Sequence, residues 1–137
     1  MFDLYGNDRL VAWKKFRDGL EISKDPFKDT LDFWRRAPYV FDFLDRIATK
    51  DWPGPWQLVI DGKYDNLAIN LGMLYTLQLT KRFMDSTLEI HRDMGLSNFC
   101  KNIVVIDRDI VVDYDTCNVY DFNKLTDTSV LYSYSNK

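Results

Sequence analysis

The chain has 137 residues and a mass of 16.2 kDa, the size of one ordinary domain, and its 46% hydrophobic and 28% charged residues exclude a disordered or collagen-like protein. The chain contains twenty-one aromatic residues but only one histidine and two cysteines. So few histidines and cysteines exclude a disulfide scaffold, a multi-ligand zinc module and a haem-attachment motif. The net charge of −3, with nine acidic and five basic side chains in residues 85–137, gives no electrostatic case for nucleic-acid binding.

The first fifty residues predict helices. Asp8 can cap a helix whose apolar residues recur every three or four positions, namely Leu10, Trp13, Phe16 and Leu20. Asp25-Pro26 is a typical helix start, because an aspartate caps and proline is favoured at the first helical position. A third, short helix is predicted from Tyr39 to Ala48.

The middle of the chain predicts a break and then a long helix. The segment Asp51–Trp56 contains two prolines around a glycine and predicts an extended turn, followed by a short extended piece over Gln57–Ile60. From Asp65 to Phe83 the apolar residues point in nearly every direction, which predicts a central helix covered on most sides.

After Met84 the pattern changes to strands. Alternation or apolar runs predict strands at 88–91, 102–106, 110–112, 118–120 and 130–135, with a hairpin turn at 107–109. The sequence therefore predicts an α+β fold, in which N-terminal helices and a buried central helix pack on a small antiparallel sheet. We expect a single domain over 1–137, with a helical part at 1–50 and the central helix and sheet at 51–137.

A cysteine–histidine pair is the first candidate for chemistry. His91 could act with Cys100 or Cys117, but neither cysteine stands at a predicted helix start, where a thiol pKa is lowered. Small buried hydrophobic residues are the favoured interpretation of both cysteines, so no catalytic residue is predicted.

Charged clusters are the next candidates. Asp107, Asp109, Asp113 and Asp115 lack the spacing of a calcium loop, so a solvated hairpin edge is favoured, and neither a metal nor another cofactor is predicted. Lys14, Lys15 and Arg17 are interleaved with acidic residues, which favours an ordinary solvated helix surface over a phosphate-binding face.

The aromatic surplus indicates a partner-binding surface, since one domain of this length has limited interior for so many rings. The predicted contact residues are Trp52, Trp56, Tyr64, Val130, Tyr132 and Tyr134. No stretch of 18 apolar residues is present, and the first residues lack a signal-peptide pattern, so we expect synthesis in a cytoplasm.

The run Asp51-Trp52-Pro53-Gly54-Pro55-Trp56-Gln57-Leu58, with the segments Asp61–Ala68 and Leu71–Leu77 and the tail over residues 104–115, resembles phage-encoded proteins of the transglutaminase-like (papain-like) superfamily. The resemblance covers about residues 25–120 and is specific in its Trp-Pro-x-Pro-Trp part. It implies a central helix that starts at the active site, followed by antiparallel strands that supply a histidine and an aspartate.

In that family a cysteine opens the central helix. Here the corresponding position is Tyr64 or Asp65, and only His91 and Asp107 match the other two positions of the triad. Because a covalent intermediate needs the thiol, the resemblance implies a retained fold without the enzyme.

The function expected from these observations is a non-enzymatic structural component of a tailed-phage virion, such as a neck, head–tail connector or tail-completion protein. It would be located in the virion, form a homo-oligomeric ring and contact other virion proteins, without membrane or sequence-specific nucleic-acid binding. Two alternatives remain open: a cysteine-dependent hydrolase or acyltransferase of the same superfamily, and a small protein that binds a host factor.

Overall fold

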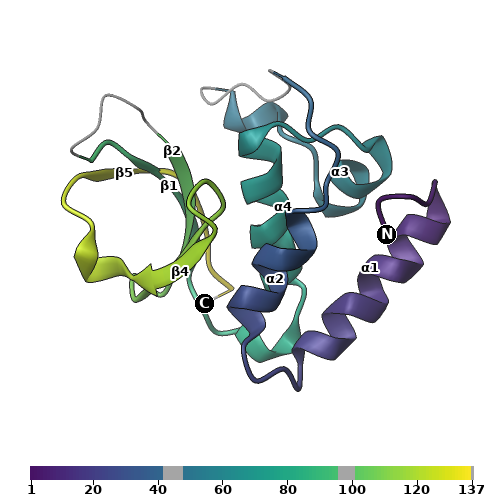
Figure 1. The fold of residues 1–137 in the computed structure, drawn as a ribbon, viewed down its shortest axis with the longest axis horizontal. Coiled ribbons are helices and arrows are strands. Elements are labelled where there is room, and N and C mark those ends of the chain that lie inside the picture. Colours follow the sequence, from purple (N-terminus) through teal and green to yellow (C-terminus); the bar gives the residue numbers. More distant parts are fainter. Residues whose placement is uncertain (42–47, 96–100, 137) are drawn as a thin grey trace.

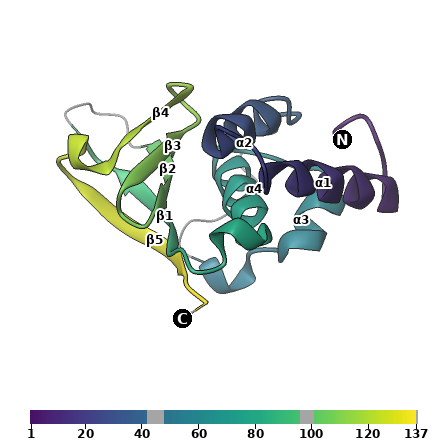
Figure 2. The same cartoon turned by 90° about the horizontal axis from the view of Figure 1, so that it is seen from below.

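The computed structural model describes residues 1–41, 48–95 and 101–136. Its helices pack on one face of a five-stranded antiparallel sheet, which confirms the α+β prediction (Figure 1). Helix α4 (Asn66–Gln78) lies against the sheet, and α1 (Asn7–Leu20) and α3 (Pro55–Asp61) lie beyond it (Figure 2). Helix α2 (Pro26–Trp34) packs on α4 and also reaches the sheet. None of the helices in the described ranges has the length and apolarity needed to cross a membrane.

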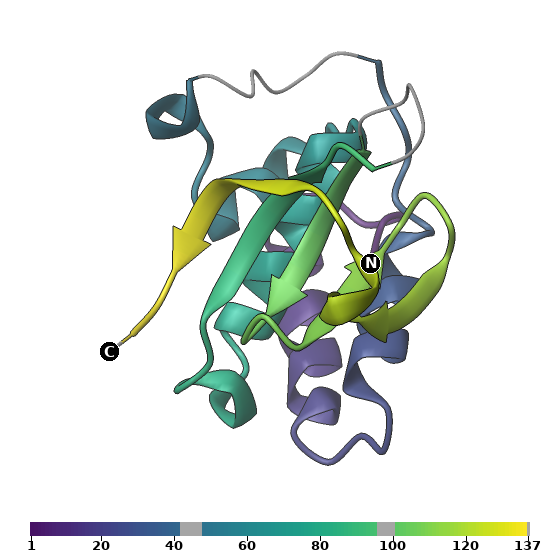
Figure 3. The ribbon, with the colours of Figure 1, turned by 90° about the vertical axis from the view of Figure 1, so that its left-hand side faces the viewer.

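The sheet has the strand order β4-β3-β2-β1-β5. Its strands are β1 (Leu88–Asp93), β2 (Lys101–Ile106), β3 (Ile110–Asp113), β4 (Asn118–Asp121) and β5 (Thr128–Tyr134), close to the predicted ranges. All neighbours pair antiparallel, and Ile90 lies opposite Val104 on β2 and Tyr132 on β5. Strand β5 runs along one edge beside β1, as its predicted edge position requires (Figure 3).

Helix α4 is buried along almost its whole length, as predicted from its unbroken apolar pattern. The Asp65 carboxylate caps its start by accepting a hydrogen bond from the Ala68 backbone N–H at 2.8 Å. The helix ends at Gln78, although the prediction extended it to Phe83, because Thr80 turns to extended backbone and donates its hydroxyl to the Thr76 carbonyl at 2.7 Å. Residues Lys81–Phe83 form a separate 3-10 turn, η2.

Residues 39–62 differ from the prediction or lie partly outside the described residues. The extended piece predicted at Gln57–Ile60 is wrong, because Pro55 occupies the first turn of α3 and Gly62, at φ 68°, closes this helix in the left-handed conformation. The short helix predicted at 39–48 falls mostly on residues 42–47, which lie outside the described residues.

The two faces of the sheet bury different side chains. Alternate strand residues, including Ile90, Val104 and Val112, join the main core with α4. The opposite residues Ile103, Val105 and Val111 form a smaller cluster, which is covered by Phe122 of the 3-10 turn η3 (Phe122–Lys124) and by nearby Leu125 and Tyr120. A side chain on one face therefore cannot meet a side chain on the other, which decides the candidate pairs below.

Candidate functional site

Polar side chains from three elements meet at the N-terminal end of α4. Asn66, the first residue of the helix, donates from Nδ2 to Oδ1 of Asp115, just after β3, at 2.7 Å. Asn102, near the start of β2, donates from Nδ2 to Oδ1 of Asn66 at 3.0 Å. The result is a directed chain of hydrogen bonds, from Asn102 through Asn66 to the Asp115 carboxylate. Because an amide nitrogen has two N–H groups, each asparagine uses one of them in this chain and has a second to donate.

Asn70, one helical turn further along α4, extends this cluster into the interior. It donates from Nδ2 to the Asn66 carbonyl at 2.9 Å, and it is fully buried. Its side-chain oxygen Oδ1 has no hydrogen-bond partner within the described part of the chain. A buried acceptor without a partner costs free energy. The first two turns of α4 therefore contain one buried oxygen, Oδ1 of Asn70, that can still accept a hydrogen bond.

The two aspartates at the end of β3 have opposite electrostatic environments. Asp113 is fully buried; burial alone raises its pKa, but hydrogen bonds from Lys101 at 2.6 Å, from Tyr120 at 2.7 Å and from the Thr116 backbone outweigh this and lower it. The pKa of Asp115 is raised, first by desolvation and then by the negative charge of Asp113. Neighbouring carboxyl groups whose pKa values are pushed apart are a typical feature of acid–base sites.

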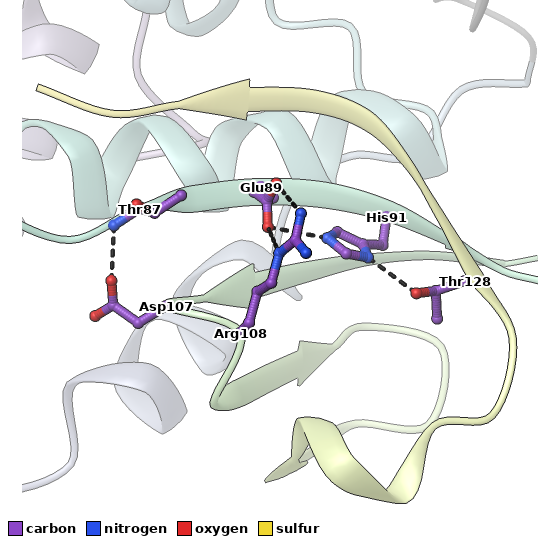
Figure 4. Close-up of polar contacts among 6 residues, drawn as sticks. All are labelled: Thr87, Glu89, His91, Asp107, Arg108 and Thr128. Atoms are coloured by element: carbon purple, nitrogen blue, oxygen red, sulfur yellow. Dashed lines mark hydrogen bonds and ion pairs between the residues drawn. The ribbon is translucent and has the colours of Figure 1, made fainter. Parts of the chain in front are cut away.

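Figure 4 shows the surroundings of His91, the histidine proposed for the cysteine pair. Its Nδ1 lies 3.1 Å from the Thr128 hydroxyl and its Nε2 lies 3.2 Å from Oε1 of Glu89. The ring packs edge-on against Phe122, so it occupies the sheet face turned away from α4. With only 2% of its surface exposed, His91 is a satisfied buried histidine.

The partners considered for His91, as the alternative to an inert histidine, do not lie beside it where the structure describes them. Cys117 packs against the main core on the α4 side of the sheet, and the sheet separates its thiol from His91. Asp107 lies in the β2–β3 turn, which follows the C-terminal end of β2, whereas Asn102 lies near the N-terminal end of that strand. The Oδ1 of Asp107 accepts a hydrogen bond from the Thr87 backbone N–H at 2.7 Å (Figure 4). Cys100 lies outside the described residues.

The predicted partner-binding residues are scattered. Trp56 on α3 is 51% exposed and Val130 on β5 is 44% exposed. Trp52 and Tyr132 are partly buried and pack on each other with ring centroids 5.8 Å apart, and Tyr134 is also partly buried. Tyr64 is completely buried and donates its hydroxyl to the Val59 carbonyl at 3.0 Å, so it is not part of a contact surface. For the other five residues, partner binding stays a prediction.

The aspartates of the β2–β3 hairpin differ from the solvated edge that was expected. Asp107 and Asp109 are exposed, but Asp113 is an interior group held by Lys101. Within the described ranges, no group of three or more histidine, cysteine, aspartate or glutamate side chains is arranged to hold a metal ion.

Comparisons with known proteins identify the fold. No family model matches the chain, and no curated protein matches it by sequence. Among solved structures, Legionella pneumophila LapG is similar at 15% identity with a TM-score of 0.68, and the match covers 98% of this chain and 80% of LapG. The calcium-bound form of LapG gives a TM-score of 0.69 at the same identity, covering 97% of this chain and 78% of LapG. The EGTA-treated form gives 0.68, with 97% and 76% covered.

LapG is a transglutaminase-like (papain-like) cysteine protease, so the chain has the fold that the Trp-Pro-x-Pro-Trp segment indicated. The same finding contradicts the expected function. The neighbours are bacterial proteases and not virion proteins, which overturns the prediction of a non-enzymatic neck, connector or tail component located in a virion. The absence of a cysteine at the start of the central helix does not by itself exclude an enzyme of this fold.

Sequence reasoning missed the two asparagines of the cluster. Asn66 directly follows the capping residue Asp65, and Asn102 stands at the start of an apolar strand, so each reads locally as an ordinary end of an element. The one available signal was that helix start, strand start and strand end each carry a polar residue next to a buried run. Assigning the histidine position of the resembled family's triad to Asn102 instead of His91 would have pointed to this cluster.

Proposed function

We propose that this chain is a hydrolase or acyltransferase of the transglutaminase-like superfamily that acts on a polypeptide, with its reaction centre at the N-terminal end of α4. The observation that carries the proposal is the convergence of Asn66, Asn102 and Asp115 from a helix start, a strand start and a strand end. The resembled family draws its own three catalytic groups from a helix start and the strands that follow it.

In this proposal Asp115 is the general base. Its carboxylate takes a proton from a water molecule, the water oxygen attacks the amide carbon of the substrate, and the proton passes to the leaving nitrogen as the carbon–nitrogen bond breaks. The second N–H groups of Asn66 and Asn102 donate to the substrate carbonyl oxygen, where negative charge develops. An amine that replaces water gives acyl transfer by the same steps.

The proposal includes the absence of the family's thiol at the helix start. Asp65 and Asn66 stand there, and no cysteine occurs between residues 1 and 99. A carboxylate that activates water avoids the covalent intermediate for which a thiol is needed. A phage origin of the gene is a further part of the proposal, resting on the Trp-Pro-x-Pro-Trp segment alone.

The test is cleavage of fluorescein-labelled casein, run beside incorporation of dansylcadaverine into casein to detect acyl transfer. We expect Asp115→Asn to lower the rate by about a hundredfold or more, since general base catalysis contributes about 10²–10⁴. Asp121→Asn, which changes an exposed aspartate on β4, is the matched control and should leave the rate unchanged. Full activity of Asp115→Asn, or no reaction with casein in either assay, contradicts the proposal.

The pH profile provides a second check on Asp115. A base must be ionised, and the pKa of Asp115 is raised above the usual 3.8 by desolvation and by Asp113. The rate should therefore fall on the acidic side at a pH above 3.8. Asn66→Ala removes a hydrogen bond that stabilises the carboxylate, so it should move this fall to still higher pH.

A thiol route is separated by two further variants, Cys100→Ser and Cys117→Ser. The carboxylate route predicts full activity in both, together with resistance to iodoacetamide. Loss of activity in either serine variant, with activity retained in Asp115→Asn, assigns the nucleophile to that cysteine instead. The homo-oligomeric state stays a prediction, which size-exclusion chromatography with light scattering tests against the 16.2 kDa of one chain.

A further inference from the structure

A cavity of about 480 Å³ is lined by residues of α1 and by Trp56 of α3. Both helices lie on the side of the molecule away from the sheet (Figure 2). This volume is within the range of small-ligand pockets. Its apolar part comes from Leu10 and Val11 of α1 and from Trp56 of α3. Val11 is 69% exposed and Trp56 is 51% exposed, which is unusual for large apolar side chains that face the same hollow.

Trp56 is held in place by a contact with the core. Its ring meets the fully buried Trp13 edge-on, with centroids 5.8 Å apart. The interior edge of the indole is therefore fixed by packing, and its other side remains available at the cavity. A rigid aromatic wall of this kind binds apolar groups with little loss of side-chain entropy.

The charged residues around the cavity are mostly basic. Lys14, Lys15 and Arg17 line it, and Asp18 is the single acidic residue among its lining residues. Lys14 and Asp18 neutralise each other, with Nζ and Oδ2 3.1 Å apart. Lys15 and Arg17 make no ion pair within the described part of the chain, although the Asp18 carboxylate also attracts the Arg17 guanidinium. Three basic residues and one acidic residue line the hollow, which therefore carries a net positive charge.

Arg17 is the more constrained of these two cations. Its guanidinium lies over the Trp13 ring, 4.6 Å from the centroid, and 5.7 Å from that of Trp56. Its Nε is buried without a hydrogen-bond partner among the described residues, and its Nη1 reaches the Leu79 carbonyl only at 3.5 Å. Since a partly desolvated guanidinium gains most from a carboxylate, an anion at the mouth of the cavity would add a favourable charge interaction with Arg17.

From this charge complementarity we propose that the α1–α3 cavity binds a free amphipathic carboxylate, an apolar chain or ring that carries one carboxylate group. The apolar body lies against Val11 and Trp56, and the carboxylate faces Lys15 and Arg17. The cavity is formed by α1 and α3 and shares no residue with the cluster of Asn66, Asn102 and Asp115, so the proposal is independent of the function proposed above.

Decanoate is the probe, followed by NMR of the backbone amides and of the Trp56 indole N–H, which is assigned with Trp56→Phe. We expect saturable shifts at α1 and α3, and binding of the neutral decanol about tenfold weaker, as expected for loss of one partly screened charge interaction. Equal binding of decanol or of decylammonium overturns the proposal, because it shows that charge is not recognised.

Two substitutions with matched controls test the location. Val11→Asp places a carboxylate at an exposed position in the cavity and should weaken decanoate binding about tenfold, and Lys15→Glu should do the same. The controls are Ile22→Asp, at an apolar residue that is 87% exposed, and Lys24→Glu. Both lie outside the cavity lining, and binding should stay within about twofold of the wild type.

Circular dichroism of all four variants shows whether each is folded. Unchanged binding in folded Val11→Asp and Lys15→Glu contradicts the assignment. An acetylated tripeptide that ends in phenylalanine with a free carboxylate tests the other source of the same chemistry. If it binds more tightly than decanoate, the occupant is a peptide terminus and the free-acid assignment is wrong.

Discussion

At the scale of single residues, Thr76 in α4 organises the aromatic core. Its Oγ1 accepts hydrogen bonds from Nε1 of Trp13 at 3.0 Å and from Nε1 of Trp34 at 2.8 Å, and it donates to the Gly72 carbonyl at 2.7 Å. Both tryptophans and Thr76 are completely buried. One hydroxyl therefore satisfies two indole donors that have no access to water.

Thr76→Val preserves the shape of the side chain and removes this acceptor. We expect the free energy of unfolding to fall by about 2–4 kcal/mol, because two buried N–H groups lose their partner. Urea denaturation measures the change, and Thr126→Val at an exposed position should stay within about 0.5 kcal/mol of the wild type. A loss below about 1 kcal/mol for Thr76→Val would show that the indoles find other acceptors.

A second prediction at this scale concerns Gly72. A Cβ built on this glycine would lie 2.4 Å from the Trp34 ring, closer than any real contact allows. Gly72→Ala should therefore destabilise the protein by about 1–3 kcal/mol, in spite of the better helix propensity of alanine. Gly19→Ala, where the added Cβ meets nothing within 4 Å, is the matched control in the same denaturation series. Equal stability of the two variants would contradict the close packing of α4 on α2.

At the scale of elements, the outer face of the sheet is held by charged groups as well as by apolar packing. Glu89 on β1 is nearly buried and lies between His91 and Arg108, whose Nε is 3.1 Å from its Oε1 (Figure 4). Burial alone raises the pKa of Glu89, but the hydrogen bonds from Arg108 and His91 outweigh it, so the pKa is lowered. The β2–β3 turn is thereby tied to β1.

This lowered pKa predicts a pH dependence of stability. The stabilisation from ionised Glu89 is fully present above the unfolded pKa of about 4.5, and it is lost as the pH falls through the lower folded value. The difference in unfolding free energy between the wild type and Glu89→Gln should be largest near neutral pH and shrink below pH 4.5. Denaturation at several pH values measures it, with Asp85→Asn as an exposed control. A difference that stays constant with pH rules this contribution out.

At the scale of the whole molecule, Arg9 joins the start of the chain to the helical layer. Its guanidinium donates to the Leu4 carbonyl at 2.6 Å, to the Phe2 carbonyl at 2.9 Å and to the Val59 carbonyl of α3 at 3.3 Å. Phe2 then packs on Trp34 and Tyr64, with ring centroids 5.3 and 5.6 Å away. The first residues are thus built into the core through one buried cation.

Arg9→Met retains the apolar stem of the side chain and removes the donors. We expect residues 1–6 to exchange their amide hydrogens faster, and the free energy of unfolding to fall by about 2–4 kcal/mol. Hydrogen exchange with mass spectrometry measures the first effect and urea denaturation the second. Arg36→Met, at an exposed arginine after α2, should change neither quantity. Unchanged exchange at residues 1–6 in Arg9→Met would show that Phe2 alone holds the segment.

The sequence alone predicts the local elements well, because each is decided by neighbours along the chain. The apolar continuity of α4, the Asp25-Pro26 start of α2, the alternation of β1 and the apolar runs of β2 and β3 all correspond to the observed elements. The helix at Pro55–Asp61 was missed, because a seven-residue helix between proline and glycine has too few turns to show a period.

Only the tertiary structure decides which polar residues meet. His91 on β1 and Cys117 in the β3–β4 turn pack on opposite faces of the sheet, a separation that no local pattern around either residue shows. Asn66 is far in sequence from Asn102 and Asp115 but contacts both, since packing α4 on the sheet brings the start of the helix to the start of β2 and the end of β3. Composition and periodicity determine the class of fold. The candidate site depends on pleat and packing, which no single segment encodes.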